Sequence, residues 1–513
     1  MSTETAPTRT YFGWQQEKVA FLFGLSLQRA AMLGVGILAL IWPFAISYIR
    51  AGLVTWPLSF VLFLLAFVRI AGRTVDEWAV AAVSYEILRF RGQNRFLSGA
   101  FAPRASETDE PKMDLPGILA PLTILEADGG SGAPIAVIHH QLDRTYTAVA
   151  RVRFPGIGLA DSSRRDQRVA SWGSLLNSQC TEGNPIIRIQ ALQRIVPESG
   201  AALQRWHSDH VTTEAPTVAV DVTKSLLSTA TLATSQREAY LAITMAAVRA
   251  ASPIKAAGGG DAGAAAVLVR NLRAMTSSIT SADLQVESWL NPRELAEVMR
   301  TAFDPDSSRV LAERRAAAAA AVLRGDEVPF EAGVDPAAAG PSAAHSGRGR
   351  YEHDGAVSVT YSVHSWPKNK VYSTALAPLL GEGKYRRTLN IHYEPRSPRA
   401  AEREIMQERT AREVAVSMRS KTGQIIPEHE KQALRRAEAQ DQERAAGHGM
   451  VRYTAYCTVT VTNPADLEDA CSELLADANS GSIELQRMWL TQDIGFAVGA
   501  LPVGMGLPKK RAA

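Results

Sequence analysis

The sequence predicts an α+β fold preceded by a helical hairpin that crosses a membrane. Three observations lead to this prediction. Two long uncharged stretches follow each other near the N-terminus, strand-like and helix-like segments alternate over the rest of the 513 residues, and a charged stretch interrupts the second half. A chain of this length exceeds what one hydrophobic core usually organises, so we expect two or three soluble units beside the hairpin.

The apolar N-terminal region predicts two membrane spans. Residues 30–49 and 51–68 carry no charged side chain, and only Arg50 separates them. A helix of about 20 residues spans the roughly 30 Å hydrocarbon layer of a bilayer, and the second run is just long enough to return. We therefore predict a transmembrane hairpin at 30–70, after a cytoplasmic segment at 1–29. A signal peptide would be shorter, and no second apolar run would follow it.

Aromatic and basic residues predict how this hairpin is anchored and oriented. Trp42, Tyr48 and Trp56 cluster toward the turn, where an aromatic belt would meet the outer interface. Arg69 and Arg73 follow the second span directly, and further basic residues flank both outer ends of the hairpin. The positive-inside rule then predicts a multi-pass protein of the cell membrane with both termini in the cytoplasm.

Residues 71–114 are expected to form a juxtamembrane helix and a linker. The segment 72–96 shows an apolar stripe at helical spacing together with several arginines. Such a helix could rest on anionic headgroups or belong to the soluble part, and the pattern favours neither interpretation.

The first soluble unit is expected at residues 115–310 and the second at residues 351–507. Alternating apolar residues predict strands at 135–139, 145–154, 186–196, 240–245, 388–393 and 451–461. Asn291 and Pro292 predict the start of a helix through Phe303, with asparagine as N-cap and proline at the first helical position. Residues 311–350 are rich in alanine and then in Gly, Pro and Ser, so we expect a short helix that leads into a flexible linker.

The second unit carries a predicted insertion. Its charged stretch 397–447 breaks at Thr422–Pro427, which predicts a protruding antiparallel helical hairpin. With the hairpin set aside, the element order is β-α-β-β-α-β, the split-βαβ or ferredoxin-like arrangement, and the first unit could be a degenerate version. A basic tail at 508–513 ends the chain.

Composition and motifs argue against several functions. The formal net charge of +3 is small for this length and disfavours nucleic-acid binding. The three cysteines show no CxxC spacing and predict small buried hydrophobes. No GxxxxGK[ST] motif is present: alanines follow the glycine cluster Gly258–Gly263, and Tyr385 follows Lys384. We therefore expect no catalytic residues, no cofactor and no metal.

One short motif keeps an enzyme as an alternative. His207 and His210 are three residues apart with Asp209 between them, a spacing that a metal site on a helix could use. No further ligand is visible nearby, so a surface helix is the simpler interpretation. The alternative is a membrane-bound enzyme with an unrecognised site.

Several segments resemble one group of membrane proteins. These are residues 145–156, 172–177 with 188–197, 291–305 and 492–507. The chain resembles actinobacterial conjugation and secretion proteins that combine a PrgI-like two-helix anchor with a region like the non-ATPase N-terminal part of VirB-type secretion ATPases. A looser similarity exists to EccE of type VII secretion.

The resemblance implies a non-catalytic docking subunit of a type IV-like conjugation or secretion apparatus. In the ATPases a nucleotide-binding domain follows such a region, whereas this sequence ends at Ala513, so a separate subunit would supply hydrolysis. The implied partners are the lipid bilayer, a secretion-type ATPase, other membrane subunits and further copies of the chain. An EccE-like type VII subunit is the alternative within this class.

Overall fold

The computed structural model describes residues 27–506, apart from positions 48, 68, 71–72, 100–112, 131–132, 154–160, 198–206, 208–209, 213–214, 231–234, 327–332, 368–370, 372–373, 382 and 422–427. Over these residues the architecture is α+β, as the sequence predicts. By length and hydropathy, no helix among the described residues qualifies as a membrane span.

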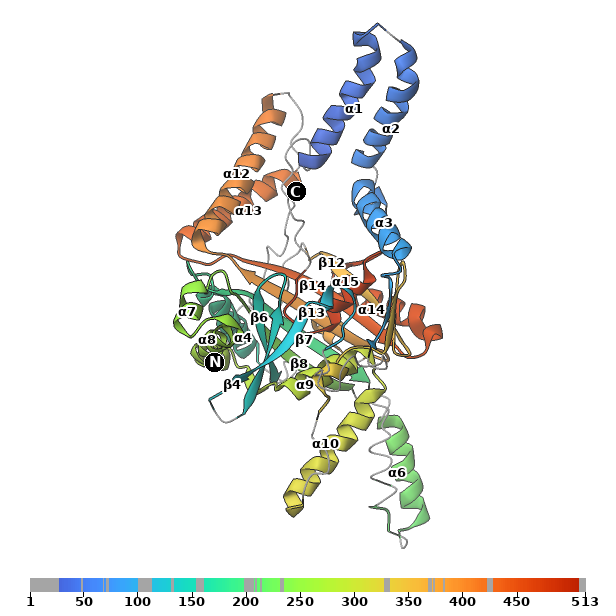
Figure 1. Ribbon diagram of the computed structural model, residues 1–513, viewed down its shortest axis with the longest axis vertical. Coiled ribbons are helices and arrows are strands. Elements are labelled where there is room, and N and C mark those ends of the chain that lie inside the picture. Colours follow the sequence, from blue (N-terminus) through green and yellow to red (C-terminus); the bar gives the residue numbers. More distant parts are fainter. Residues whose placement is uncertain are drawn as a thin grey trace, which may run out of the picture.

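A large antiparallel sheet forms the centre of the molecule (Figure 1). Within the described residues it has 13 strands. Eleven follow one another as β3-β10-β11-β12-β14-β13-β7-β8-β6-β5-β4, while β15 pairs with β12 and β9 pairs with β6. The strands are β3 (Arg95–Leu97), β4 (Leu122–Asp128), β5 (Pro134–His140), β6 (Thr145–Arg153), β7 (Ile186–Pro197), β8 (Ser235–Ala246), β9 (Gln285–Trp289), β10 (Ala343–Ser346), β11 (Tyr351–His353), β12 (Ala356–Ser365), β13 (Arg386–Pro395), β14 (Val451–Val461) and β15 (Glu484–Arg487).

The two halves of the sheet repeat one strand order. Strands β9, β6, β8 and β7 lie side by side in the first half, and β15, β12, β14 and β13 do so in the second. If the four strands of each half are numbered along the chain, their order across the sheet is therefore fourth, first, third and second in both halves. The halves join where β7 pairs with β13, with Leu389 opposite Gln193. Because these junction strands are antiparallel, equivalent connections in the two halves leave the sheet at opposite ends.

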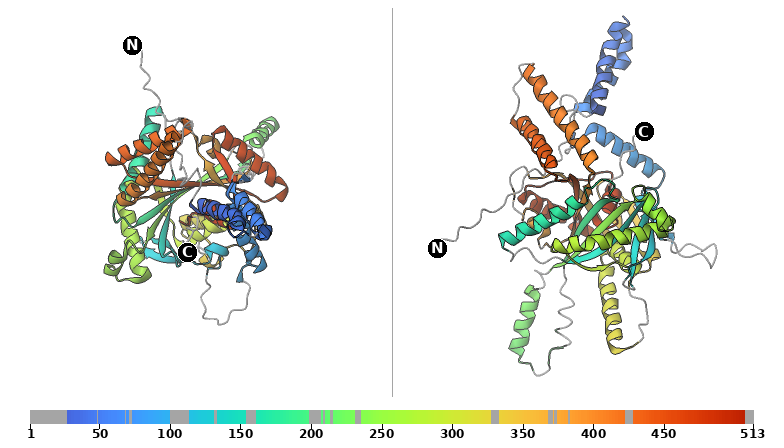
Figure 2. Two further views of the ribbon diagram at one scale, coloured as in Figure 1. Left: turned by 90° about the horizontal axis from the view of Figure 1, so that it is seen from above. Right: turned by 90° about the vertical axis from the view of Figure 1, so that its left-hand side faces the viewer.

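The described helices cover the faces of the sheet or project from its ends. They are α1 (Leu27–Ala45), α2 (Gly52–Phe67), α3 (Val75–Phe90), α4 (Ser162–Ser178), α6 (Thr217–Ala230), α7 (Ala251–Ala256), α8 (Gly260–Ser281), α9 (Pro292–Phe303), α10 (Ser307–Arg324), α11 (Ala377–Leu380), α12 (Pro398–Lys421), α13 (Glu428–Ala445), α14 (Leu467–Ser480) and α15 (Gln492–Ala500). The α1–α2 and α12–α13 hairpins project from one end, which we call the hairpin end (Figures 1 and 2). Helices α6 and α10 project from the opposite end.

One face of the sheet is covered by α4, α8 and α14, and side chains of successive strand residues alternate between this face and the opposite one. In the first half this face packs against α8 and α4 and buries Val137, Ile243 and Leu268. In the second half it packs against α14 and buries Val359 and Leu474. Apolar burial holds the opposite face as well, where a further cluster packs against α9 and α15.

The opposite face carries buried polar side chains that hold the C-terminal segment. Gln190 donates from Nε2 to the carbonyl oxygen of Leu501 at 2.6 Å, and Asn390 donates from Nδ2 to that of Val498 at 2.8 Å. Gly504 has a positive φ of 70°, and a Cβ there would lie 2.3 Å from the Thr244 hydroxyl oxygen. The polar alternation along these strands therefore serves a close backbone contact with the last described residues.

Local signals placed several elements correctly. The helix expected from Asn291 is α9, and its capping box is formed, because the Asn291 side chain accepts from the Glu294 backbone N–H at 2.9 Å and Glu294 accepts from that of Asn291 at 3.0 Å. The expected hairpin at 397–447 contains α12 and α13. Its predicted break lies outside the described residues.

The segment 311–350, expected to be a short helix leading into a flexible linker, begins with a helix and carries further regular structure where it is described. It contains most of α10, a 3-10 turn at Pro336–Ala338, and strand β10. Gly340 shows why a linker-like composition packs here: a Cβ at this position would lie 2.2 Å from the Asp114 carbonyl oxygen. Small residues let two backbones approach closely. A composition rich in Gly, Ala and Ser therefore fits a tightly packed segment as well as a flexible linker.

Candidate functional site

The predicted anchor residues lie on the α1–α2 hairpin or just beyond it. Trp42 and Trp56 are 57% and 39% exposed, and the Trp56 ring lies 6.1 Å from that of Phe44. The two tryptophans therefore flank the turn, and their role as an aromatic belt stays a prediction. Arg69 and Arg73 lie in the short strands β1 (Arg69–Ile70) and β2 (Arg73–Thr74), which pair with each other after α2. Tyr48 lies outside the described residues.

Helices α1 and α2 meet through small and hydroxyl residues. The buried Ser59 hydroxyl donates to the Gly36 carbonyl oxygen at 2.7 Å, which joins the middle of one helix to the middle of the other. A Cβ at Gly36 would lie 3.5 Å from the Leu62 Cβ, so the helix backbones are close. Large apolar side chains instead point away from the contact; the exposed ones include Leu38, Ile41, Phe44, Leu53, Leu58 and Phe60. The hairpin thus exposes its large apolar residues and buries its small ones.

Helix α3 joins this hairpin to the sheet. The buried Tyr85 donates from its hydroxyl to the carbonyl oxygen of Ser346 at 3.3 Å, and β3 pairs with β10 directly after the helix. Helix α3 therefore packs on the sheet with one side, which agrees with a helix of the soluble part, and it exposes a second, apolar side; whether that side rests on headgroups stays a prediction. That exposed side comprises Val80, Val83, Ile87 and Phe90.

The α12–α13 hairpin has the opposite chemistry. Across the two helices, Arg409 Nη1 lies 3.0 Å from Asp441 Oδ2, and Arg444 Nη1 lies 3.9 Å from Glu402 Oε1. The buried positions are mostly small; they are Ala401, Ile405, Ala433 and Ala437. The two helices carry ten basic and nine acidic residues, so the surface has mixed charge.

The histidine motif is only partly described. His207 and His210 are described, whereas Asp209 lies outside the described residues. Among the described residues, no group of three or more His, Cys, Asp and Glu side chains is arranged to hold a metal ion. The cluster Gly258–Gly263 covers the end of the turn after α7 and the first residues of α8, and its first three glycines have positive φ. Its backbone therefore uses glycine for the turn itself.

Two buried histidines lie on the polar face of the sheet. His392 shares a hydrogen bond from Nε2 with the Val498 carbonyl oxygen at 2.9 Å, and His353 shares one from Nε2 with the Ser358 hydroxyl at 2.8 Å. Burial lowers the pKa of each to about 4, so both are neutral near pH 7. They support the C-terminal segment and the β11–β12 hairpin.

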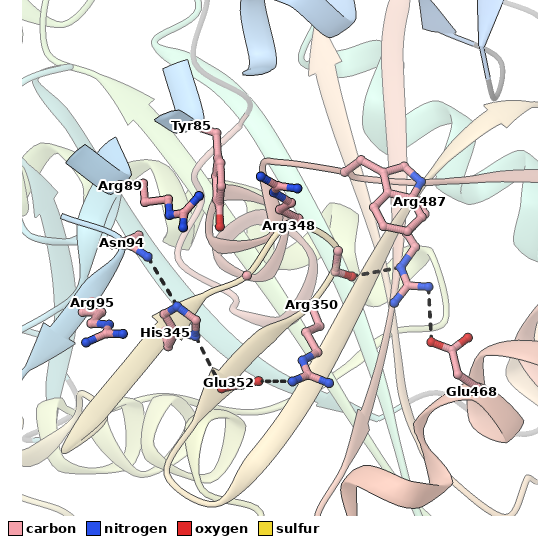
Figure 3. A pocket seen from close by; sticks show the side chains of 13 residues that line it. Tyr85, Arg89, Asn94, Arg95, His345, Arg348, Arg350, Glu352, Glu468 and Arg487 are labelled. Carbon is pink, nitrogen blue, oxygen red and sulfur yellow. Dashed lines mark hydrogen bonds and ion pairs between the residues drawn. The ribbon is translucent and has the colours of Figure 1, made fainter. Parts of the chain in front are cut away.

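A cavity of about 800 Å³ lies where three distant segments meet (Figure 3). One wall is formed by Tyr85 and Arg89 of α3, by Asn94 in the turn that follows, and by Arg95 at the start of β3. A second wall is the β10–β11 hairpin, and a third comes from α14 and β15. Five arginines line it against two glutamates; they are Arg89, Arg95, Arg348, Arg350 and Arg487, with Glu352 and Glu468. We call this the arginine pocket.

The β10–β11 turn carries two of these arginines and is held in place by Arg487 and Trp489. Arg487 donates from Nε to the Gly349 carbonyl oxygen at 2.9 Å, and its guanidinium carbon lies 4.7 Å from the centre of the Trp489 ring. A Cβ at Gly349 would lie 2.4 Å from that ring. Only glycine therefore allows the turn to pack this closely on Trp489. In this position of the turn, Arg348 and Arg350 line the pocket.

The arginines of the pocket are only partly neutralised. Arg350 Nη2 lies 2.7 Å from Glu352 Oε1, and Arg348 Nη2 lies 3.3 Å from Glu86 Oε1. Glu86 also faces Arg89, at 3.5 Å. Within the described part of the chain, Arg95 forms no ion pair. A positive excess therefore remains around the cavity.

Sequence analysis did not find the arginine pocket, because its walls are more than 100 residues apart in the chain. The one local signal is the segment Ser346–Tyr351, where glycines alternate with arginines in a turn between two short strands.

Comparison with known proteins assigns no family to these features: no protein-family model and no curated protein sequence matches the chain.

Proposed function

We propose that the chain is a membrane-anchored, non-catalytic docking subunit of a type IV-like conjugation or secretion apparatus, and that it recruits a separate ATPase. One observation carries the proposal: an apolar and a charged helical hairpin project from the same end of one continuous sheet (Figure 1). An apolar hairpin suits a bilayer, and a charged hairpin beside it suits a protein partner at the cytoplasmic surface.

The exposed side chains of α1 and α2 support the anchor. Leu38 and Phe60, near the middle of each helix, are both 68% exposed. Water would make such a surface costly, whereas lipid tails would accept it. Close contact through Gly36 and Ser59 is the packing that membrane helices use, because small residues and hydroxyls bring backbones together where no hydrophobic force acts between helices. We propose that both termini face the cytoplasm.

The repeated strand order supports a finer interpretation of the soluble part. We propose that each half is a ferredoxin-like, split-βαβ unit, with α4 and α8 on the first and α14 on the second. The two units would then share one sheet through β7 and β13. Such fusion leaves the β13–β14 connection free to carry an insertion without affecting the core.

The α12–α13 hairpin is the proposed docking element. It is inserted between two directly paired strands, because Pro395 lies opposite Val451 and the Arg396 backbone N–H donates to the Met450 carbonyl oxygen at 2.9 Å. The sheet needs no such insertion for its own pairing. Its nearly balanced charge favours a protein partner over a nucleic acid.

The test compares a variant that lacks this hairpin with a control variant that lacks the equivalent connection of the first half. Residues 397–449 are replaced by Asn-Gly, which suits a two-residue connection between antiparallel strands. The control replaces residues 198–234 in the same way, since Pro197 lies opposite Ser235 in the equivalent position of the first half. Both variants and the full chain are tagged and purified from native membranes in mild detergent, and mass spectrometry identifies the proteins that co-purify.

We expect the full chain and the control to recover a VirB-like ATPase and other membrane subunits, and the hairpin variant to lose the ATPase while it stays in the membrane. Equal recovery by both excisions would disprove docking through the hairpin. Recovery of the full chain alone, after cross-linking, would contradict the docking function. Recovery of type VII components would favour the EccE-like alternative, and bound transition metal in the purified protein would favour an enzyme.

A further inference from the structure

We infer that the arginine pocket binds a phosphate-bearing ligand. The pocket is independent of the docking function, because none of its walls comes from the α12–α13 hairpin. It is lined by five arginines and two glutamates, so its fixed charge is positive. A volume of about 800 Å³ lies within the range of small-molecule sites, which is roughly 300–1,000 Å³.

The kinds of side chain select phosphate. Arginine presents a planar fork of N–H donors that is always charged, and this fork matches phosphate oxygens. The cations approach from separate directions, with Arg89 and Arg95 on one wall and Arg348 and Arg350 on the β10–β11 turn (Figure 3). A group with several charged oxygens can satisfy more than one wall at once, whereas a single carboxylate presents only two oxygens to them.

The existing ion pairs make the pocket responsive to such a ligand. Arg348 and Glu86 are 67% and 53% exposed, so their pair at 3.3 Å is largely solvated and weak. An incoming phosphate can therefore take over the guanidinium of Arg348 at little cost. By contrast, Arg487 is mostly buried and donates to Gly349. Its position keeps the turn seated, so we assign it a positioning role.

The position of the pocket allows two sources of phosphate. It lies at the C-terminal end of α3, and α3 is joined to α2 through the short strands β1 and β2 (Figure 1). A phospholipid headgroup and a soluble phosphate compound share the chemistry that these arginines recognise. The lipid source rests on the proposed membrane anchor, whereas the soluble source does not.

The experiment uses the full chain in mild detergent and three probes: inorganic pyrophosphate, nanodiscs of phosphatidylglycerol, and a polyglutamate peptide as a non-phosphate anion. Isothermal titration calorimetry measures pyrophosphate and peptide binding, and biolayer interferometry measures the nanodiscs against neutral phosphatidylcholine ones. The first variant, R348Q/R350Q, removes two charges from the pocket. Its control, R270Q/R309Q, removes two charges from exposed residues of α8 and α10.

A second variant separates geometry from charge. G349A keeps every charge but places a methyl group against the Trp489 ring, which displaces the turn. We expect R348Q/R350Q and G349A each to weaken phosphate binding about tenfold or more, because charge-assisted hydrogen bonds are lost. The control should change less than about twofold. Circular dichroism confirms that each variant is folded.

Each outcome decides the assignment. Pocket-dependent binding of pyrophosphate identifies a soluble phosphate ligand, and pocket-dependent binding of phosphatidylglycerol alone identifies a headgroup. Absence of binding to both phosphate probes, equal losses in R348Q/R350Q and R270Q/R309Q, or equally tight binding of polyglutamate would overturn the inference. Failure of the docking experiment leaves these results unaffected, so the two proposals fail separately.

Discussion

The α1–α2 and α12–α13 hairpins have the same backbone design and opposite surfaces. Both are antiparallel helix pairs that project from the hairpin end of the sheet (Figure 2). The first is held by Gly36 and Ser59 and exposes large apolar side chains, whereas the second is crossed by ion pairs such as Arg409–Asp441. The comparison teaches that one backbone architecture can carry two opposite surfaces, and that the side chains away from the helix contact decide which surface a hairpin presents.

The largest expected effect is a charge placed on the apolar hairpin. The variant L38R/F60R puts an arginine near the middle of each helix, which should cost about 5 kcal/mol or more in a bilayer. We expect the variant to be lost from the membrane fraction in liposome flotation. The control M406R/V414R makes equivalent changes at exposed apolar positions of α12 and should float as the unaltered chain does. Flotation of L38R/F60R would refute the anchor.

The second expected effect is a loss of folding stability in acid, and its source should lie in the sheet and in neither hairpin. His353 and His392 have folded-state pKa values of about 4, below the unfolded value of 6.5. The unfolded chain therefore binds these protons more tightly, and stability present above pH 6.5 is lost as the pH falls toward 4. Between pH 7 and pH 5 we expect a loss of about 2 kcal/mol for each histidine.

Urea unfolding followed by tryptophan fluorescence at pH 7 and pH 5 measures this loss. The variant H392Q keeps a donor for the Val498 carbonyl oxygen but does not titrate, so it should lose about half of the pH dependence. The chain without residues 397–449 should keep all of it. If the excision abolished the pH dependence, the charged hairpin and not the sheet would be its source.

A smaller effect is expected from overpacking the charged hairpin. Ala437 is buried in α13, and replacing it with leucine should destabilise the helix pair by about 1–3 kcal/mol. Hydrogen exchange of peptides from α12 and α13 should therefore become faster, while peptides from β13 and β14 keep their protection. Faster exchange in the strands would show that the hairpin and the sheet unfold together.

The smallest effect should come from a surface ion pair. Arg409 pairs with Asp441 and with Glu413, at 3.0 Å and 2.9 Å, and its side chain is partly exposed. The variant R409A should slightly increase hydrogen exchange in α12 at low salt, and this difference should vanish at high salt because salt screens exposed charges. Hydrogen exchange in the α1–α2 hairpin should not depend on salt, either in R409A or in the unaltered chain. A difference that persisted in high salt would indicate a packing role for Arg409.

The sequence by itself determined the local elements whose signals are short-range. The capping residues Asn291 and Glu294 specify the start of α9, and alternation specifies strands such as β14, because a helix end or a half-buried strand depends on neighbours within a few residues. The charge pattern of residues 397–447 likewise indicated a helical hairpin. These features were predictable without any knowledge of what they pack against.

Only the tertiary structure decided which segments meet. The pairing of Leu389 with Gln193 joins two predicted units into one sheet, and no local pattern encodes that contact. The arginine pocket likewise depends on the approach of Arg89, Arg348 and Arg487, which are far apart in the chain. The physical reason is that apolar burial and backbone pairing over the whole sheet bring these segments together, so charges that look isolated in the sequence face one cavity in the fold.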